Sequence, residues 1–389
     1  MALLLLFVVA CINAGTWVSG SLPDGVKPPS ETQLANVCGT DSKEHTDMDK
    51  SSSPQLRKLA EYEKVCGGAF TKKQMFFARM PESADDAVRL AADMAGTLKE
   101  FAEYSVSPLV IFEPTNEAGT VLPIRSFHQG LYDAALANYF QTLKNEGVTD
   151  TMMGMWVPFP EANTPIWHTT DPEDFAANIN HVVDLQKQYF PDSKASILLN
   201  SRSYPNDDDD WNHGTYASLV PYVEDIKAGL IDSFGYQGFP WLPPADEQSS
   251  GNAILKADQF LRPGLAADAA DALGTHDIWF NTGTFSKAHT GQAHTVVAMG
   301  SHSREVLLKD ILAQAKVLSD KGYTIAIHLF SEDKTTTPEA TDWSYWTPGA
   351  VDESTSATVF KTFVRSTLLN NIPLWLYDDD HQGSVLSSN

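Results

Sequence analysis

The sequence predicts an α/β protein, a closed (β/α)8 barrel with an N-terminal extension. After Lys72, short apolar runs alternate with longer helical patterns almost to the C-terminus, which is typical of α/β folds. Each run is continuous rather than alternating, as in parallel strands that are buried on both faces. Polar and aromatic residues follow the runs, where barrels carry their working residues. An open doubly wound sheet is the alternative, although no Gly-rich phosphate loop follows any run.

Seven apolar runs are predicted strands, and they are spaced along the barrel region as the alternating pattern requires. They are Gln74–Arg79, Leu109–Glu113, Met153–Phe159, Ala195–Asn200, Ser233–Gly238, Asp277–Gly283 and Tyr323–Phe330. A closed barrel needs one strand more. We expect it early in the chain, around Val65–Phe70.

The helices between these runs carry recognisable start and stop signals. Ser83 with Asp86 has the spacing of a capping box and opens a helix that runs to Tyr104. Asp171 is placed to cap a second helix, and Pro172 suits the first turn of that helix. Two further helices are expected, at Leu131–Lys144 and from a cap at Ser303 to the glycine Gly322.

The chain divides by composition into a leader, an extension, the barrel and a tail. The first twenty residues contain a short apolar run that is too brief to span a bilayer but suits a secretory signal. The next fifty are polar and rich in Pro, Ser and Thr. The predicted parts are residues 1–20 (signal peptide or lipoprotein signal), 21–72 (extension), 73–380 (barrel) and 381–389 (tail).

The three cysteines fit an exported protein. Cys11 lies in a segment that resembles a lipoprotein box, which would anchor the protein to the cell surface through a lipid. Cys38 and Cys66 then remain as a pair, and in an oxidising compartment a disulfide between them is expected to staple the extension. Two buried free thiols are the alternative. We therefore expect a secreted or extracellular protein.

Charge and motif content mainly exclude partners and cofactors. Lys+Arg 27 against Asp+Glu 50 gives a net charge of −23, so nucleic acid and anionic lipid are poor partners. The histidines show no zinc-site spacing, and the acidic run Asp207–Asp210 lacks the alternating ligands of a calcium loop. We expect neither metal nor cofactor. Gly-x-Ser-x-Gly is absent, which argues against a serine esterase. Nothing in the sequence indicates the oligomeric state.

The residues that follow the predicted strands suit a carbohydrate. Carboxylates, amides and indoles recur there, and sugars need polar partners for their hydroxyls and aromatic rings for their apolar faces. Trp167, Tyr236 and Trp241 are candidates for stacking, and Asn281 for contact with a hydroxyl. Cleavage of a glycosidic bond uses two carboxyl groups, of which one is protonated. Glu161 is the candidate acid, because Pro and aromatic neighbours favour its neutral form.

Several segments resemble glycoside hydrolase family 26. MWVPFPEANTPIW with DPEDFAANINHVVDLQKQYF is similar to the family's fourth-strand region, GLIDSFGYQGFPW to its sixth strand, DIWFNTGTF to its seventh and IAIHLFSED to its eighth, while VIFEPTNEAG and LYDAAL resemble the approach to the fourth. The similarity covers roughly residues 75–330. It implies a clan A (β/α)8 barrel. Members of this family are mostly secreted enzymes that cut β-mannans, and in some cases mixed-linkage β-glucans or β-1,3-xylans, with retention.

The resemblance also implies roles for individual residues. Glu161 matches the acid/base of the family, and Asn163 matches the asparagine that follows it. Trp167 lies near the tryptophan that lines the cleaved-sugar subsite. Tyr236 falls where an aromatic residue of the sixth strand contacts the nucleophile.

Two departures from the family pattern bear on activity. Pro160 stands where the family has His before the acid/base, and Asn281 stands where the seventh strand carries the nucleophilic Glu. An amide cannot form a glycosyl ester. Glu332 and Glu113 are the substitute carboxylates, and their separation from Glu161 would distinguish retention, at about 5–5.5 Å, from inversion, at roughly 6.5–9.5 Å. The alternative functions are a non-hydrolytic carbohydrate-binding protein and an unrelated lyase or esterase.

Overall fold

The computed structural model describes residues 51, 53, 56–57, 73–165, 171–203, 215–239, 257–283, 301–330 and 374–377. Within them, the strands pair in parallel in chain order and the last pairs with the first, so the barrel is closed. The described strands are β1 Lys73–Arg79, β2 Ser107–Glu113, β3 Met155–Pro158, β4 Lys194–Asn200, β5 Ser233–Gln237, β6 Asp277–Thr282, β7 Thr324–Phe330 and β8 Leu374–Tyr377. The predicted fold class is confirmed.

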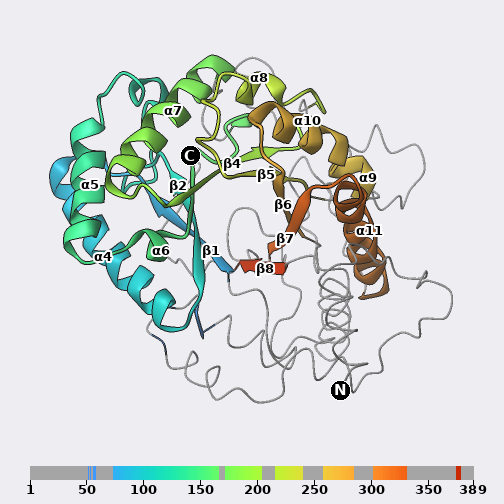
Figure 1. Cartoon of the computed structure of the whole chain (residues 1–389), viewed down its shortest axis with the longest axis horizontal. Coiled ribbons are helices and arrows are strands. Elements are labelled where there is room, and N and C mark those ends of the chain that lie inside the picture. The colour runs from blue at the N-terminus through green and yellow to red at the C-terminus, as the bar shows by residue number, and fades with distance from the viewer. Residues whose placement is uncertain are drawn as a thin grey trace.

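Helices lie around the outside of the strands, as Figure 1 shows. They pack on the outward side of the sheet, and β2 to β6 are almost entirely buried, as their continuous apolar runs predict. The described helices are α4 Ala84–Glu103, η2 Ile124–Ser126, α5 Asp133–Asn145, α6 Asp150–Met153, α7 Pro172–Tyr189, α8 Val220–Val223, α9 Ala257–Phe260, α10 Pro263–Leu273 and α11 Ser301–Asp320.

Most predicted helix boundaries are confirmed, with one exception. The Ser83 side chain accepts a hydrogen bond from the Asp86 N–H at the start of α4, and Asp171 accepts one from the Glu173 N–H at the start of α7. The prediction that Ser303 caps α11 was wrong, because this helix begins two residues earlier, at Ser301. The sequence after residue 300 continues without a breaker, so a cap position could not be fixed from it.

The eighth strand corrects the sequence prediction. It is Leu374–Tyr377, near the C-terminus, whereas the segment Val65–Phe70 lies outside the described residues. As a consequence, the strands that the resemblance numbers fourth, sixth, seventh and eighth are β3, β5, β6 and β7, respectively, in the structure. Glu161 therefore follows the third strand of the barrel and not the fourth.

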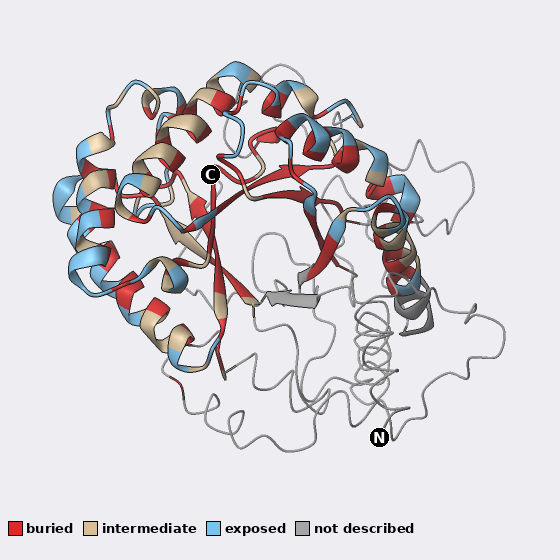
Figure 2. Ribbon diagram, in the orientation of Figure 1, coloured by how far each residue is buried: buried red, intermediate tan, exposed pale blue. Residues whose placement is uncertain are grey.

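The apolar core has two layers, one on each side of the sheet, and Figure 2 shows most residues of the coloured strands as buried. The outer layer joins strands to helices, as where Phe76 of β1 meets Phe101 of α4 edge to face, with ring centroids 5.4 Å apart. The inner layer contains no helix residue and fills the barrel. Its buried members are Met75, Leu109, Ile111, Met155, Val157, Leu198, Phe239, Trp279 and Ala326.

Trp279 of β6 occupies the interior of the barrel, and a glycine on the next strand makes room for it. A Cβ added to Gly235 would lie 2.3 Å from Cζ2 of Trp279 and 2.7 Å from the carbonyl oxygen of Ile197. The Trp279 indole donates a hydrogen bond to Ser196 Oγ, 2.9 Å away. Glycine is therefore required at position 235 because the indole approaches the backbone closely.

Candidate active site

Glu161 lies in a tight turn directly after β3. The backbone φ is 52° at Phe159 and 53° at Glu161, in the left-handed region that residues other than glycine seldom adopt. The Glu161 N–H donates to the carbonyl oxygen of Leu198 at 2.7 Å, and the Glu161 carbonyl accepts from N and Oγ1 of Thr164 at 2.9 and 2.8 Å. Such backbone strain persists where surrounding contacts hold it, and it clusters at functional sites.

Two asparagines join this turn to the end of β4. The Asn163 amide accepts from the Asn200 backbone N–H at 2.9 Å and donates to the Asn200 carbonyl at 2.8 Å and to Ser203 Oγ at 3.0 Å. Asn200 in turn donates from Nδ2 to Oε2 of Glu161 at 3.2 Å. The contacts of Asn163 in the structure are thus to protein, and contact with a sugar stays a prediction. Together the two amides set the direction of the Glu161 carboxylate.

Polar side chains without a carboxylate, ammonium or guanidinium group continue from β4 around the same end of the barrel. We call Gln237, Asn281 and His328, at matched register on β5, β6 and β7, the amide row. Asn281 Nδ2 donates to Gln237 Oε1 at 2.5 Å, and Asn281 Oδ1 is 2.6 Å from His328 Nδ1. All three side chains are buried. Asn200 of β4 is the register partner of Gln237 on β5, and Asn200 also contacts Glu161. The row therefore adjoins the Glu161 turn.

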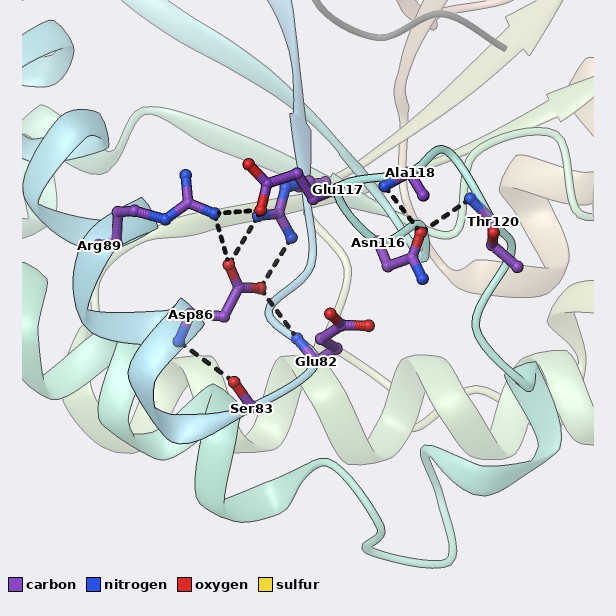
Figure 3. A network of polar contacts seen from close by, with 9 residues as sticks. Glu82, Ser83, Asp86, Arg89, Asn116, Glu117, Ala118 and Thr120 are labelled. Carbon is purple, nitrogen blue, oxygen red and sulfur yellow. Dashed lines mark hydrogen bonds and ion pairs between the residues drawn. The ribbon is translucent and has the colours of Figure 1, made fainter. Parts of the chain in front are cut away.

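The ends of β1 and β2 are held by charges instead, in what we call the ionic network of Arg79, Asp86, Arg89 and Glu117 (Figure 3). Both terminal nitrogens of Arg79 donate to the Asp86 carboxylate, at 2.7 and 2.6 Å. Arg89 donates to Asp86 at 3.0 Å and to Glu117 at 2.9 Å.

Asp86 is ionised more readily than an ordinary carboxyl group. Burial alone would raise the pKa of Asp86. The hydrogen bonds from Arg79 and from the Glu82 backbone N–H, with the charges of Arg79 and Arg89, outweigh that effect and hold the pKa below its ordinary value. The network is therefore charged at neutral pH.

Glu113 is the last residue of β2 and lies beside Arg79 in the strand register. Its side chain is partly buried, and its strand adjoins β3, which precedes Glu161. The loop that follows is fixed by Asn116, whose Oδ1 accepts from the backbone N–H groups of Ala118 at 3.0 Å and Thr120 at 2.9 Å (Figure 3). The structure thus places Glu113 at the same end of the barrel as Glu161.

Tyr236 does not fit its predicted role as a sugar contact. Its neighbours Gly235 and Gln237 face the barrel interior, so the tyrosine ring points to the helices. It is fully buried, between Phe234 and Phe280 at centroid distances of 6.2 and 6.1 Å. A continuous apolar strand gives no sign of which residues face inward, so its sequence did not reveal this.

Other predicted site residues are not covered by the structure. Trp167, Trp241 and Glu332 lie outside the described residues, as do Cys11, Cys38 and Cys66. Among the residues that are described, no group of three or more His, Cys, Asp or Glu side chains is placed to hold a metal ion. No helix in the same part of the chain is long and apolar enough to cross a membrane.

Sequence reasoning missed the roles of three polar residues at this end of the barrel. Asn200, Gln237 and His328 are buried and bonded to predicted site residues. A signal was present for two of them, because Asn200 and Gln237 each stand at the end of an apolar run. His328 lies within such a run, two residues before its end, and only the register shows that it meets Asn281.

Comparison with known proteins identifies the fold. No family model matches the sequence, and no curated protein does. A solved family 1 β-glucosidase from Thermotoga maritima is similar, with a TM-score of 0.50, 11% identity, and coverage of 84% of this chain and 88% of that one. A β-glucosidase from Thermotoga maritima in complex with N-octyl-5-deoxy-6-oxa-N-(thio)carbamoylcalystegine is also similar. Its TM-score is 0.51 at 12% identity, and the alignment covers 87% of this chain and 94% of that one. At these identities the similarity shows a shared barrel fold.

Proposed function

We propose that this protein is a glycoside hydrolase that acts on a β-linked saccharide, with Glu161 as general acid/base. The observation that carries the proposal is the placement of Glu161. A strained turn at the carboxyl end of β3 holds it, and Asn200 aims its carboxylate with a hydrogen bond of 3.2 Å. Barrel enzymes carry their chemistry at this end of the strands. The fold shared with β-glucosidases supports the same reaction class.

In the reaction, Glu161 donates its proton to the glycosidic oxygen as the bond from that oxygen to the anomeric carbon breaks. Water supplies hydroxide to the anomeric carbon and returns a proton to the enzyme, so the balance is one water for one bond cleaved. A second carboxylate must stabilise the cationic sugar or attack it. Glu332 and Glu113 are the candidates, and Glu113 has support from its place on the strand next to β3.

We propose as substrates the polysaccharides that the sequence resemblance implies, which are β-mannan, mixed-linkage β-glucan and β-xylan. Neutral hydroxyls suit the buried amides of Asn200, Gln237 and Asn281, which offer both donors and acceptors. The net charge of −23 disfavours polyanionic substrates.

The test is the variant Glu161→Gln, assayed on each polysaccharide by release of reducing ends. We expect kcat to fall by roughly 10²- to 10⁴-fold, the usual contribution of a general acid. Aryl β-glycosides with acidic phenol leaving groups should lose much less activity, because such leaving groups need no proton. Glu146→Gln is the matched control, since this carboxylate is half exposed and lies at the C-terminal end of α5, before α6 and β3, whereas Glu161 follows β3. Full activity in Glu161→Gln would exclude this role.

A non-hydrolytic saccharide-binding protein is the second candidate function. It is favoured by one observation, the amide of Asn281 bonded on both sides where the family resemblance places a nucleophilic carboxylate. Tight binding of an oligosaccharide by the wild type with no product from any of the three polysaccharides would support it. Measurable product that disappears in Glu161→Gln would exclude it.

A further inference from the structure

We propose that His328 and Gln237 are positioning residues that lock the amide of Asn281, so that Asn281 can bind a neutral vicinal diol of the saccharide. The proposal rests on the proposed function and names the chemistry that one part of the site would recognise. Two observations carry it: the hydrogen bonds that Asn281 makes to Gln237 and His328, and the contact between the rings of His328 and Trp279.

The hydrogen bonds of the row fix which atom of Asn281 faces which neighbour. The Asn281 carbonyl oxygen faces His328 Nδ1 at 2.6 Å, and an amide oxygen only accepts, so Nδ1 carries the hydrogen. Nδ2 of Asn281 donates to Gln237 Oε1 at 2.5 Å. With Gln237 in its present orientation, a flipped Asn281 amide would set oxygen against oxygen. The imidazole keeps its Nδ1–H in both the neutral and the protonated form, so the lock does not depend on protonation of His328.

The His328 ring is itself held from the barrel interior. The Trp279 indole meets it edge to face, with centroids 6.3 Å apart and planes at 90°. That indole is fixed by its hydrogen bond to Ser196 and by the space at Gly235. A chain of contacts thus runs from the middle of the barrel to Asn281, and it restricts the Asn281 side chain to one orientation.

The locked amide retains half of its hydrogen-bonding capacity. An asparagine side chain has two N–H groups and an oxygen with two lone pairs, and the row uses one N–H and one lone pair. One donor and one acceptor of the planar amide remain for a ligand. Adjacent sugar hydroxyls match that pair, since one can accept while the other donates. A fixed amide binds such a diol better than a rotating one, because its side-chain freedom is already lost.

Two variants of His328 separate the hydrogen bond from the packing of the ring. His328→Phe keeps a flat ring against Trp279 but removes the Nδ1 donor, whereas His328→Asn keeps an N–H donor near the position of Nδ1 and removes the ring. Both are made in the Glu161→Gln background, so that mannan, glucan and xylan oligosaccharides bind without cleavage. The measurement is Kd by calorimetry, with Tm recorded for each variant.

We expect His328→Phe to raise Kd about ten-fold, the ratio that one lost hydrogen bond produces, and His328→Asn to recover part of that loss. Unchanged binding by His328→Phe would overturn the proposal. So would equal weakening in both variants, because the ring and not the donor would then be responsible.

A second measurement tests the lock without any saccharide. Nitrogen-15 spectra of histidine-labelled protein report which ring nitrogen of His328 carries hydrogen in the neutral form, and we expect Nδ1. Hydrogen on Nε2 alone would overturn the positioning role and leave the proposed function standing. Failure of the Glu161→Gln protein to bind any of the oligosaccharides, with His328 intact, would overturn the diol assignment together with the proposed function.

Discussion

The two sides of the barrel's carboxyl end hold their strands together by different chemistry. On the side of β1 and β2, charged groups meet in the ionic network, where Asp86 binds Arg79 and Arg89. On the side of β5 to β7, the amide row joins neighbouring strands through two amides and an imidazole, with Asn281 at its centre. Glu161 follows β3, between the two.

This difference separates a structural task from a recognition task. The ionic network ties the start of α4 to the loop after β2, and its charges are matched to one another. The amides of Gln237 and Asn281 carry no formal charge, so a neutral sugar could contact them without removing the hydration shell of an ion. A network of paired ions fixes a loop, whereas a row of amides leaves donors and acceptors for a ligand.

The largest effect on stability should come from Gly235, which makes room for the Trp279 ring that packs against His328. Gly235→Ala places a Cβ 2.3 Å from the Trp279 ring and 2.7 Å from the Ile197 carbonyl, and backbone on one side cannot yield easily. We expect a loss of about 3 kcal/mol in the free energy of unfolding, measured by urea denaturation.

Gly96→Ala is the matched control for this substitution. Gly96 lies inside α4 with nothing within 4 Å of a new Cβ, so the variant should gain about 0.5–1 kcal/mol from helix propensity. Equal stability of Gly235→Ala and the wild type would show that the indole does not occupy this space, and the support for His328 would fall with it.

A smaller effect on the free energy of unfolding is expected from the ionic network. Asp86→Asn should cost about 2 kcal/mol at pH 7, because Arg79 loses its charged partner in a site where the Asp86 side chain is only 10% exposed. The lowered pKa of Asp86 gives the pH dependence its sign. Its stabilisation is complete above the ordinary carboxyl value of 3.8 and is lost as pH falls through the lowered pKa.

The difference in unfolding free energy between wild type and Asp86→Asn should therefore shrink below about pH 4. Glu117→Gln serves as the control within the same network. Its side chain is 74% exposed, so we expect a change within about 0.5 kcal/mol. A difference for Asp86→Asn that stays constant down to pH 2 would rule out the charge as its source.

The smallest of the three effects belongs to the amide row. Asn281→Leu keeps the branching at Cγ but leaves Gln237 and His328 without this hydrogen-bond partner, and we expect a loss of about 1.5 kcal/mol in the free energy of unfolding. Because the Asn281 amide does not titrate, this loss should change less with pH below about pH 4 than the effect of Asp86→Asn does. Parallel pH profiles for the two variants would contradict the division of the barrel end into a charged and a neutral side.

The positions of the first seven strands were predictable because a parallel strand is apolar throughout, and that pattern is local. The eighth was not, since Leu374–Tyr377 is only four residues long, and its identity depends on pairing with both β1 and β7. Closure of a barrel is a property of residues distant in sequence. The expectation of an early strand, around Val65–Phe70, placed the missing strand at the wrong end of the chain.

The candidate site was predictable in part for the same reason. Glu161 stands at the end of an apolar run, so its place at the carboxyl end of a strand followed from the sequence. Tyr236 stands near the end of another run, yet it faces the helices while its neighbour Gln237 faces the interior. Successive side chains of a strand point to opposite faces of the sheet. In a run that is apolar on both faces, the sequence does not show which residues point inward.

The sequence by itself determined the alternation of strands and helices, the helix caps at Ser83 and Asp171, and the polar residues available at the strand ends. Each of these depends on neighbours within a few positions of the chain. Only the tertiary structure decided which of those polar residues meet. Asn281 and His328 are 47 residues apart and bond because β6 and β7 align in one register. Register is fixed by packing across the whole barrel, and no local segment contains that information.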